Sequence, residues 1–328
     1  MLNVGIAGAW HVHAKDYFSQ LKQSKRVSIT ALWDEDEGLG KPWAEERGLD
    51  FAADLDEFLF GRGLDAVVVT TPTASHKDVI GKAVAAGKHV FTEKVLAADS
   101  EEARLIADLI EKSNVSFAIS FPLLSNPKIL YAKKLLDEKA LGTVTGARFR
   151  RSHSGVSDGW LPKRWFDVSK SCGGAMMDLG AHPAYILPFL FGAPKRVSSF
   201  MTSPYGTGSD ENAIMLCEFE GGLIASGETA FVTYGVPDLL EIYGTEGSLF
   251  IHGDEVHIAS KSLAASGIAS GKPAKLPDAL PSPVIRFIDA VEAGEKSPLN
   301  LGTKDALTLT RMIEAAYLSA SGGVSVSF

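Results

Sequence analysis

The chain has 328 residues, of which 45% are hydrophobic and 22% are charged, a composition close to that of ordinary globular proteins. Its 32 Lys and Arg residues against 40 Asp and Glu residues give a formal net charge of −8, which argues against a nucleic-acid partner. No apolar run approaches the length of a membrane span, and a strand-like segment from Leu2 leaves no room for a secretory signal. These features predict a cytoplasmic protein of two domains with no membrane partner.

The first 121 residues alternate short apolar strands with segments that suit helices. We expect strands at 3–8, 27–33, 65–70, 89–92 and 115–121, and helices at 14–21, 43–47, 76–86 and 100–112. Strands that alternate with helices imply right-handed crossovers and a parallel, doubly wound sheet of the Rossmann type. Residues 66–69 are apolar throughout, as a central strand covered by helices on both faces should be. The sequence therefore predicts a dinucleotide-binding Rossmann domain over residues 1–121.

The first strand ends at Gly8, where the pyrophosphate of a dinucleotide is held in such a sheet. Aligned on Gly8, the G-x-G-x-x-G fingerprint keeps only its first glycine, because Trp10 and His13 occupy the other two glycine positions. We expect this turn to line a cofactor groove through Gly8, Ala9, Trp10, His11 and Val12.

Histidines at positions 11 and 13 are also candidate metal ligands. They have no third ligand nearby in the chain, and Cys172 and Cys217 show no metal-ligand spacing. No metal site is predicted. The two cysteines fit a reducing compartment.

Asp34 ends the second strand at the distance where an acidic residue bonds the ribose hydroxyls of a dinucleotide. Glu35, Asp36 and Glu37 follow it without an arginine, so a 2′-phosphate would meet four carboxylates. On these electrostatic grounds NAD is favoured over NADP. The alternative interpretation is an acidic loop that caps the next helix.

Two further strands end in polar residues on the same edge of the predicted sheet, where ligands of open α/β sheets bind. The cofactor-binding residues expected from these two ends are Thr70, Thr71, Pro72, His76, Glu93 and Lys94. A lysine at the end of a buried strand can act in proton transfer. The alternative is a solvated lysine that pairs with the neighbouring glutamate.

Beyond residue 121 the alternation stops. After a helix at 128–138, the sequence predicts strands at 142–153, 195–202, 213–219, 222–231, 239–243 and 248–252. We interpret residues 122–328 as an α+β domain for substrate binding and oligomerisation, built on an open, largely antiparallel sheet. One face of this sheet should carry helices, and the other could form a subunit interface.

A carboxylate and an imidazole, Asp178 and His182, lie four residues apart in an otherwise apolar run that begins at Gly173. This spacing places both on one face of a helix. Polar groups in an apolar setting need a partner or a ligand. The two side chains either bond each other or a neighbouring strand, or they face a ligand in a cleft.

Aromatic and charged residues on both sides of residue 160 suit a sugar, because aromatic faces stack on sugar rings and charged side chains bond hydroxyl groups. His153 and Trp165 are the candidate substrate contacts. A solvated or interface strand explains the neighbouring arginines equally well.

Taken together, these motifs resemble the Gfo/Idh/MocA family, the glucose-fructose oxidoreductase and inositol dehydrogenase group. Beyond the opening turn, Thr71-Pro72 with His76 fits the family pattern, Glu93-Lys94 stands for its E-K-P, and Gly173 to His182 stands for its G-G-x-x-x-D-x-G-x-H. The resemblance implies that Lys94 and His182 are the catalytic pair and that Asp178 holds a substrate hydroxyl. It also implies a homo-oligomer formed through the carboxyl-terminal sheet.

The sequence departs from the family in several places. Val95 replaces the proline of E-K-P, Leu124 stands where many members carry an arginine, and Tyr185 replaces an aspartate commonly found three residues beyond the histidine. Pro183 follows His182, and a residue before proline is biased away from helical dihedral angles.

The function expected is that of an NAD-dependent oxidoreductase. It would transfer hydride between nicotinamide and a secondary alcohol or ketone of a cyclic sugar, sugar derivative or polyol. One alternative is an NAD-dependent lyase or glycosidase that oxidises its sugar transiently. Another is a non-catalytic NAD or sugar sensor, for which a proton-transfer pair would have no use.

Overall fold

A computed structural model describes residues 1–267, 270–271, 273 and 275–328 of the chain. By their contacts these residues form two compact units. The first unit combines Met1–Phe121 with Pro281–Thr310, and the second combines Pro122–Leu280 with Arg311–Phe328. These units differ from the expected domains 1–121 and 122–328, because residues 281–310 pack with the first unit.

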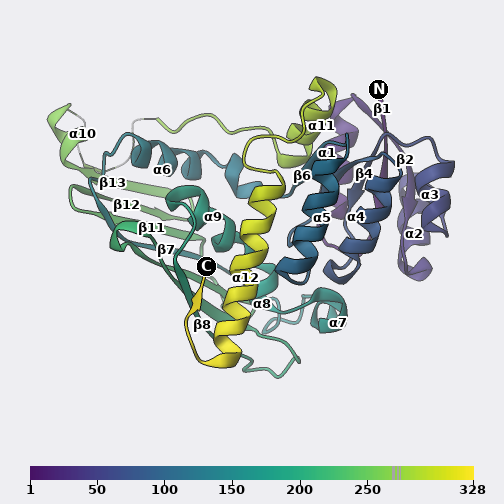
Figure 1. The fold of residues 1–328 in the computed structure, drawn as a ribbon. Coiled ribbons are helices and arrows are strands. Elements are labelled where there is room, and N and C mark those ends of the chain that lie inside the picture. The colour runs from purple at the N-terminus through teal and green to yellow at the C-terminus, as the bar shows by residue number, and fades with distance from the viewer. Residues whose placement is uncertain (268–269, 272, 274) are drawn as a thin grey trace. The chain divides into compact units, whose positions relative to one another are not determined.

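The first unit is built on a six-stranded parallel sheet with the order β3-β2-β1-β4-β5-β6 (Figure 1). Its strands are β1 (Leu2–Ala7), β2 (Val27–Trp33), β3 (Asp50–Ala52), β4 (Ala66–Val69), β5 (His89–Thr92) and β6 (Phe117–Ile119). All pairings between them are parallel. The strand order reverses between β1 and β4, so the predicted doubly wound sheet is confirmed. The edge strand β3 and the helix that follows it, α3 (Leu55–Gly61), were not predicted.

Helices of this unit follow the strands, as right-handed crossovers require. They are α1 (Ala14–Ser24), α2 (Glu37–Arg47), α3 (Leu55–Gly61), α4 (His76–Ala85), α5 (Ser100–Lys112), α11 (Pro283–Ala293) and the first residues of α12 (Thr303–Gly322). In α5 the buried residues Ala103, Ile106, Ala107 and Ile110 recur at helical spacing and form one apolar face. Asp99 accepts the backbone N–H of Glu102 and caps the start of this helix.

The second unit is built on an eight-stranded sheet with the order β13-β12-β11-β7-β10-β9-β8-β14. The strands are β7 (Val144–Ser152), β8 (Arg196–Thr202), β9 (Asn212–Glu218), β10 (Ile224–Ala230), β11 (Leu239–Gly244), β12 (Gly247–His252), β13 (Glu255–Ser260) and β14 (Val326–Ser327). Only the pairing of β10 with β7 is parallel among these strands. The prediction of an open, largely antiparallel sheet is confirmed.

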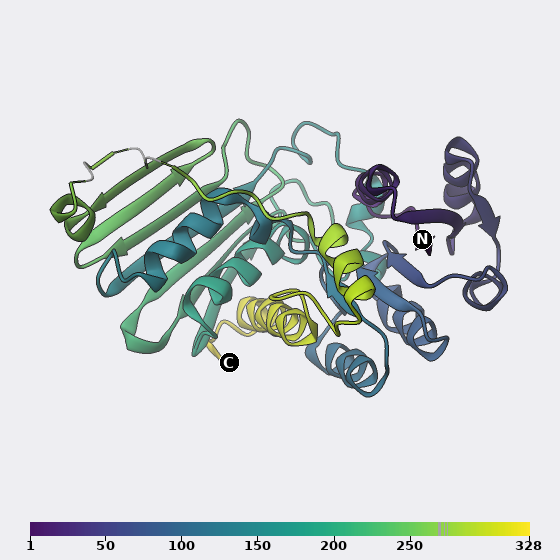
Figure 2. The same ribbon diagram turned by 90° about the horizontal axis from the view of Figure 1, so that it is seen from above.

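Helices cover one face of this second sheet (Figure 2). The unit contains α6 (Pro127–Asp137), α7 (Val168–Ser171), α8 (Ala175–Asp178), α9 (Ala181–Phe191), α10 (Lys261–Ala265) and the end of α12. Side chains of β9 alternate accordingly, with Ala213, Met215 and Cys217 buried and Leu216 exposed on the other face. No helix among the described residues has the length and hydropathy needed to cross a membrane.

Candidate functional site

The turn after β1 lies directly against the turn after β4. Gly8 has a φ of +99°, and a Cβ atom at this position would lie 2.7 Å from the backbone nitrogen of Thr71, so only glycine is accommodated. The backbone N–H of His11 donates to the carbonyl of Thr70 at 3.0 Å. The structure therefore brings together the predicted cofactor residues of these two strand ends.

Asp34 joins the end of β2 to the same turn. Its carboxylate is buried and accepts the backbone N–H of Ala9 at 2.6 Å and that of Asp36 at 2.8 Å. Burial raises the pKa of Asp34 above its usual value and outweighs these hydrogen bonds, which act to lower it. A carboxylate has about four acceptor positions, so two remain for a ribose hydroxyl.

His76 connects the segments that follow β4 and β5. Its buried ring places Nδ1 2.9 Å from the carbonyl oxygen of Val95 and Nε2 3.3 Å from that of Thr71. Burial lowers the pKa of His76, although its backbone partners act in the opposite direction. The side chain thus holds the backbone next to Lys94, whose peptide bond to Val95 is cis.

Glu93 and Lys94 follow β5, and both side chains are buried. Oε2 of Glu93 accepts the backbone N–H of Lys94 at 3.0 Å, while Oε1 accepts the hydroxyl of Tyr17 and lies 3.5 Å from Nδ1 of His11. Burial acts to raise the pKa of Glu93, but the charges of the nearby histidines and Lys94 bring it below its usual value. Glu93 is therefore an ionised, buried carboxylate.

In the second unit, Asp178 and His182 come from two consecutive helices. Helix α8 ends at Asp178, and α9 begins at Ala181. Two helices therefore stand where one was expected. The backbone N–H of Gly180 donates to the carbonyl of Ala175 at 2.8 Å and that of His182 to the carbonyl of Leu179 at 3.0 Å, which interrupts the regular helical pattern. Pro183 falls in the first turn of α9, where a helix makes no use of the missing N–H.

Both of these polar side chains have an aromatic hydrogen-bond partner. Trp165 donates its Nε1–H to Oδ2 of Asp178 at 3.2 Å. The hydroxyl oxygen of Tyr185 lies 2.9 Å from Nδ1 of the buried His182 and accepts the backbone N–H of Leu123 at 3.2 Å. The sequence pointed to Tyr185 only as a departure from the family pattern, although its spacing of three from His182 on a helix brings the two side chains together.

Asp210 was missed by the sequence analysis, yet it positions the start of α8. Its carboxylate accepts the backbone N–H groups of Gly174 at 2.9 Å and Met176 at 2.6 Å, and the hydroxyl of Tyr317 at 2.7 Å. A Cβ atom on Gly174 would overlap the carbonyl oxygen of Asp210, at 2.0 Å. Thirty-six residues separate the two, so no local pattern announces this contact.

His153 lies among aromatic rings at the end of β7. Its ring stacks on Phe231 with centroids 5.1 Å apart, and the exposed Trp160 lies 4.6 Å away. Burial lowers the pKa of His153, while the charge of Asp178 acts to raise it. The ring contacts therefore place His153 between Phe231 and Trp160, and the charge of Asp178 acts on its pKa.

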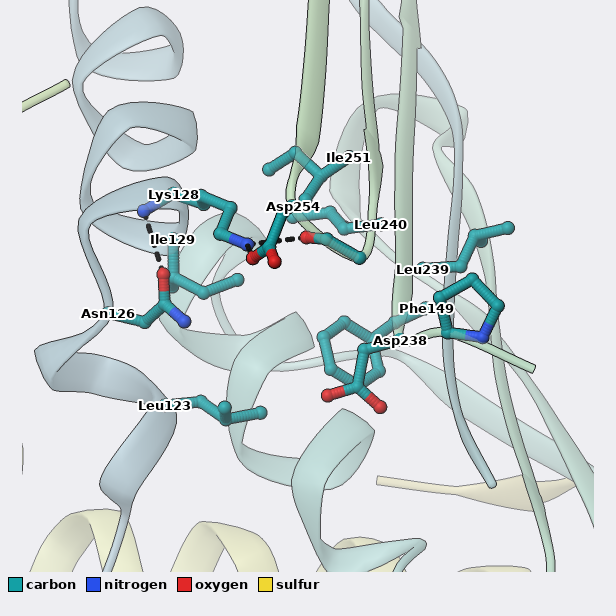
Figure 3. Close-up of a pocket in the computed structure, with 12 residues that line it drawn as sticks. Leu123, Asn126, Lys128, Ile129, Phe149, Asp238, Leu239, Leu240, Ile251 and Asp254 are labelled. Carbon is teal, nitrogen blue, oxygen red and sulfur yellow. Dashed lines mark hydrogen bonds and ion pairs between the residues drawn. The ribbon is translucent and has the colours of Figure 1, made fainter. Parts of the chain in front are cut away.

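A cavity of about 220 Å³ lies between α6 and the second sheet (Figure 3). Leu123 and Ile129 line it on the helical side, and Phe149, Leu240 and Ile251 line it on the sheet side. An ion pair closes part of its rim, with Nζ of Lys128 2.8 Å from Oδ1 of Asp254. In the part of the chain that the structure describes, none of the predicted site residues lines this cavity.

Comparison with known proteins assigns the chain to a family. Residues 2–121 match the model of the oxidoreductase family with an NAD-binding Rossmann fold, and residues 129–250 match that of the GFO/IDH/MocA C-terminal domain. The scyllo-inositol 2-dehydrogenase (NAD(+)) of Bacillus subtilis is 28% identical over 257 residues, which cover 76% of this chain and 72% of that protein.

Two further matches span nearly the whole chain. The D-xylose 1-dehydrogenase (NADP(+)) 2 of Haloferax volcanii is 26% identical and aligns over 98% of both chains. A solved levoglucosan dehydrogenase, in complex with NADH and levoglucosan, has the same fold, with a TM-score of 0.86, 21% identity and coverage of 99% and 98% of the two chains. The protein is an NAD-binding oxidoreductase that belongs to the Gfo/Idh/MocA family.

Proposed function

We propose that the protein is an NAD-dependent dehydrogenase that acts on a secondary alcohol of a cyclic sugar, sugar derivative or polyol, or on the corresponding ketone. The proposal rests on Asp178 and His182 of the second unit, whose side chains are both held in place by hydrogen bonds. The carboxylate of Asp178 and the imidazole of His182 are each held by an aromatic partner, beside a group of stacked rings around His153. Relatives in the family are named for inositol and xylose, which agrees with this substrate class.

The first unit offers suitable groups for a dinucleotide. The side-chain hydroxyl of Thr71 is buried and has no hydrogen-bond partner among the described residues, at the strand end where a dinucleotide lies in this fold. The residues that would hold the cofactor are Gly8, Ala9, Trp10, His11, Val12, Asp34, Thr70, Thr71, Pro72, His76, Glu93 and Lys94. His76 would act indirectly, by fixing the backbone of its two partners.

Charge supports NAD over NADP as the preferred cofactor. Asp34 is followed by three further acidic residues, and Oε2 of Glu35 accepts the hydroxyl of Ser75 at 3.0 Å. A 2′-phosphate placed near Asp34 would face like charges, which are repelled most strongly where water is excluded. A ribose hydroxyl would instead donate a hydrogen bond to the carboxylate.

Three residues would share the chemistry on the substrate. When bound, NAD supplies the acceptor of the hydride from the substrate carbon. The ring of His182 would take the hydroxyl proton, the ammonium of Lys94 would donate a hydrogen bond to the reacting oxygen, and Asp178 would accept one from a neighbouring hydroxyl. His153 and Trp165 would contact the sugar ring.

We also propose that copies of the chain associate through the uncovered face of the second sheet. Phe200, Leu216 and Ile224 lie on this face in adjacent strands and are 70%, 40% and 61% exposed. Exposed apolar side chains that gather on one sheet face are typical of a protein interface. Association of two chains through this face would bury these three side chains.

A dehydrogenase screen tests the proposed function. The full chain is incubated with a panel of polyols and cyclic sugars, with NAD and NADP in parallel, and NADH or NADPH formation is followed by absorbance. We expect NAD to be reduced by at least one member of the panel. NAD binding without reduction by any of them contradicts the proposal, and substrate turnover without net NADH would identify the lyase alternative.

A further inference from the structure

The first turn of the protein carries two histidines that meet a buried carboxylate from a distant strand end. His11 lies in the turn after β1, His13 directly precedes α1, and Glu93 follows β5. One potential ligand atom from each residue lies within 4.8 Å of those from the other two. The sequence offered no third ligand near the histidines, and the fold supplies one from about 80 residues away.

We propose that His11, His13 and Glu93 form a binding site for a divalent transition-metal ion such as Zn²⁺. Nδ1 of His11 and Oε1 of Glu93 are 3.5 Å apart. Two ligand atoms of a tetrahedral metal, each about 2.0–2.2 Å from the ion, lie roughly 3.4 Å from one another. This pair already has the required spacing. Nδ1 of His11 also accepts the backbone N–H of His13 at 3.3 Å, so an ion would replace that hydrogen bond while the ring of His13 approaches.

Outer hydrogen bonds orient the proposed ligands. Nδ1 of His13 lies 3.0 Å from Oδ2 of Asp16, which leaves Nε2 of the same ring for an ion. The carboxylate of Glu93 is fixed by the hydroxyl of Tyr17 and by a backbone N–H. Metal-binding histidines typically donate their second ring N–H to a carboxylate in this way, and ligating carboxylates are themselves hydrogen-bonded.

The ligand types and the exposure select the class of ion. Two imidazoles and one carboxylate suit Zn²⁺, Co²⁺ or Ni²⁺, whereas Mg²⁺ and Ca²⁺ prefer oxygen ligands. The side chains of His11 and Glu93 are 7% and 2% exposed, but that of His13 is 46% exposed and gives the ion a path from solvent. A fourth position would be open to water or to an anion. All three ligands belong to the first unit. Two of them, His11 and Glu93, are also proposed to contact NAD, so metal binding is measured without NAD and needs no dehydrogenase activity.

Metal binding to the full-length protein tests the proposal directly. Chelator-treated protein is dialysed against Zn²⁺ and its metal content measured, and Co²⁺ is titrated while the visible absorption of tetrahedral Co²⁺ is followed. We expect one equivalent of metal per chain. His11→Ala, His13→Ala and Glu93→Gln should each weaken binding by about tenfold or more.

Matched variants make the result specific to this cluster. His257→Ala, which removes an exposed histidine on β13 of the second unit, should bind like the wild type. Because buried His11 and Glu93 can also affect folding, the rise in melting temperature with Zn²⁺ is compared between the wild type and His13→Ala, whose side chain is half-exposed. Absence of stoichiometric binding, or binding and stabilisation that persist in His13→Ala, would overturn the proposal.

Discussion

The hydroxyl oxygen of Tyr185 lies 2.9 Å from Nδ1 of His182. At this sequence position, three residues beyond the histidine, members of the family commonly carry an aspartate. Tyrosine is neutral, so it orients the ring without adding a negative charge beside it. A hydrogen bond from Nδ1–H to this oxygen would fix the orientation of the imidazole and the tautomer whose Nε2 has the lone pair, as a base acting through Nε2 requires.

Removing this hydroxyl should therefore slow catalysis without affecting the nucleotide. We expect Tyr185→Phe to lower kcat by roughly five- to tenfold, the effect of about 1 to 1.4 kcal/mol from one orienting hydrogen bond, and to leave the KM for NAD unchanged. Tyr131→Phe, a change of another buried tyrosine in α6, serves as the control. Equal kcat values in Tyr185→Phe and the control would show that the contact has no catalytic role.

Cofactor preference should depend on Asp34. Asp34→Asn removes the charge that would repel a 2′-phosphate, so we expect the ratio of kcat/KM for NAD to that for NADP to fall by about tenfold or more. Asp108→Asn changes a half-exposed acidic residue of α5, outside this acidic segment, and should leave the ratio within about twofold of the wild-type value. A ratio unaffected by Asp34→Asn would remove the electrostatic basis for NAD selection.

The stability of the first unit should fall as the pH is lowered through the titration range of histidine. Burial lowers the pKa of His76 in the folded state, so the unfolded chain binds the proton more readily. The stability that comes from the neutral ring is present above a pH of about 6.5 and is lost below it. We expect the urea midpoint to decrease between pH 7.5 and pH 5.5, and to decrease less in His76→Gln. The same pH dependence in both proteins would contradict this assignment.

Association through the open sheet face should be sensitive to charge. Leu216→Glu and Ile224→Glu each place a carboxylate on the exposed apolar side of adjacent strands, and we expect a lower molar mass by light scattering after size-exclusion chromatography. Leu109→Glu, on the exposed side of α5 in the first unit, should keep the wild-type mass. A monomeric wild type would rule the interface out.

Regular parts of the fold were predictable because their signals are local. The four residues of β4 are apolar and fully buried, and the helical spacing of α5 appears directly in its sequence. Strand β3 has only three residues at the edge of its sheet and no apolar run to announce it. The break between α8 and α9 was also not predicted. It changes the hydrogen-bond partners of Gly180 and His182, while Leu179 and Gly180 keep helical dihedral angles.

The long-range contacts of the candidate site were less accessible. The types and the order of residues in the sequence identified Lys94, Asp178 and His182 as candidates, but they did not identify the residues that hold these side chains in place. Asp210 supports the start of α8 from the loop before β9, and Glu93 reaches His11 across 82 positions of the chain. Such contacts depend on how the strands are ordered in the sheet, which no local sequence pattern encodes.

The most direct test of the proposed mechanism replaces its two proton-transfer residues. With a substrate found in the screen, Lys94→Ala and His182→Ala are each compared with the wild type in turnover and in the Kd for NAD measured by calorimetry. Loss of proton transfer should lower kcat by about 100-fold or more, while the Kd of His182→Ala stays within about threefold of the wild-type value. Wild-type turnover in either variant would contradict the proposed catalytic pair.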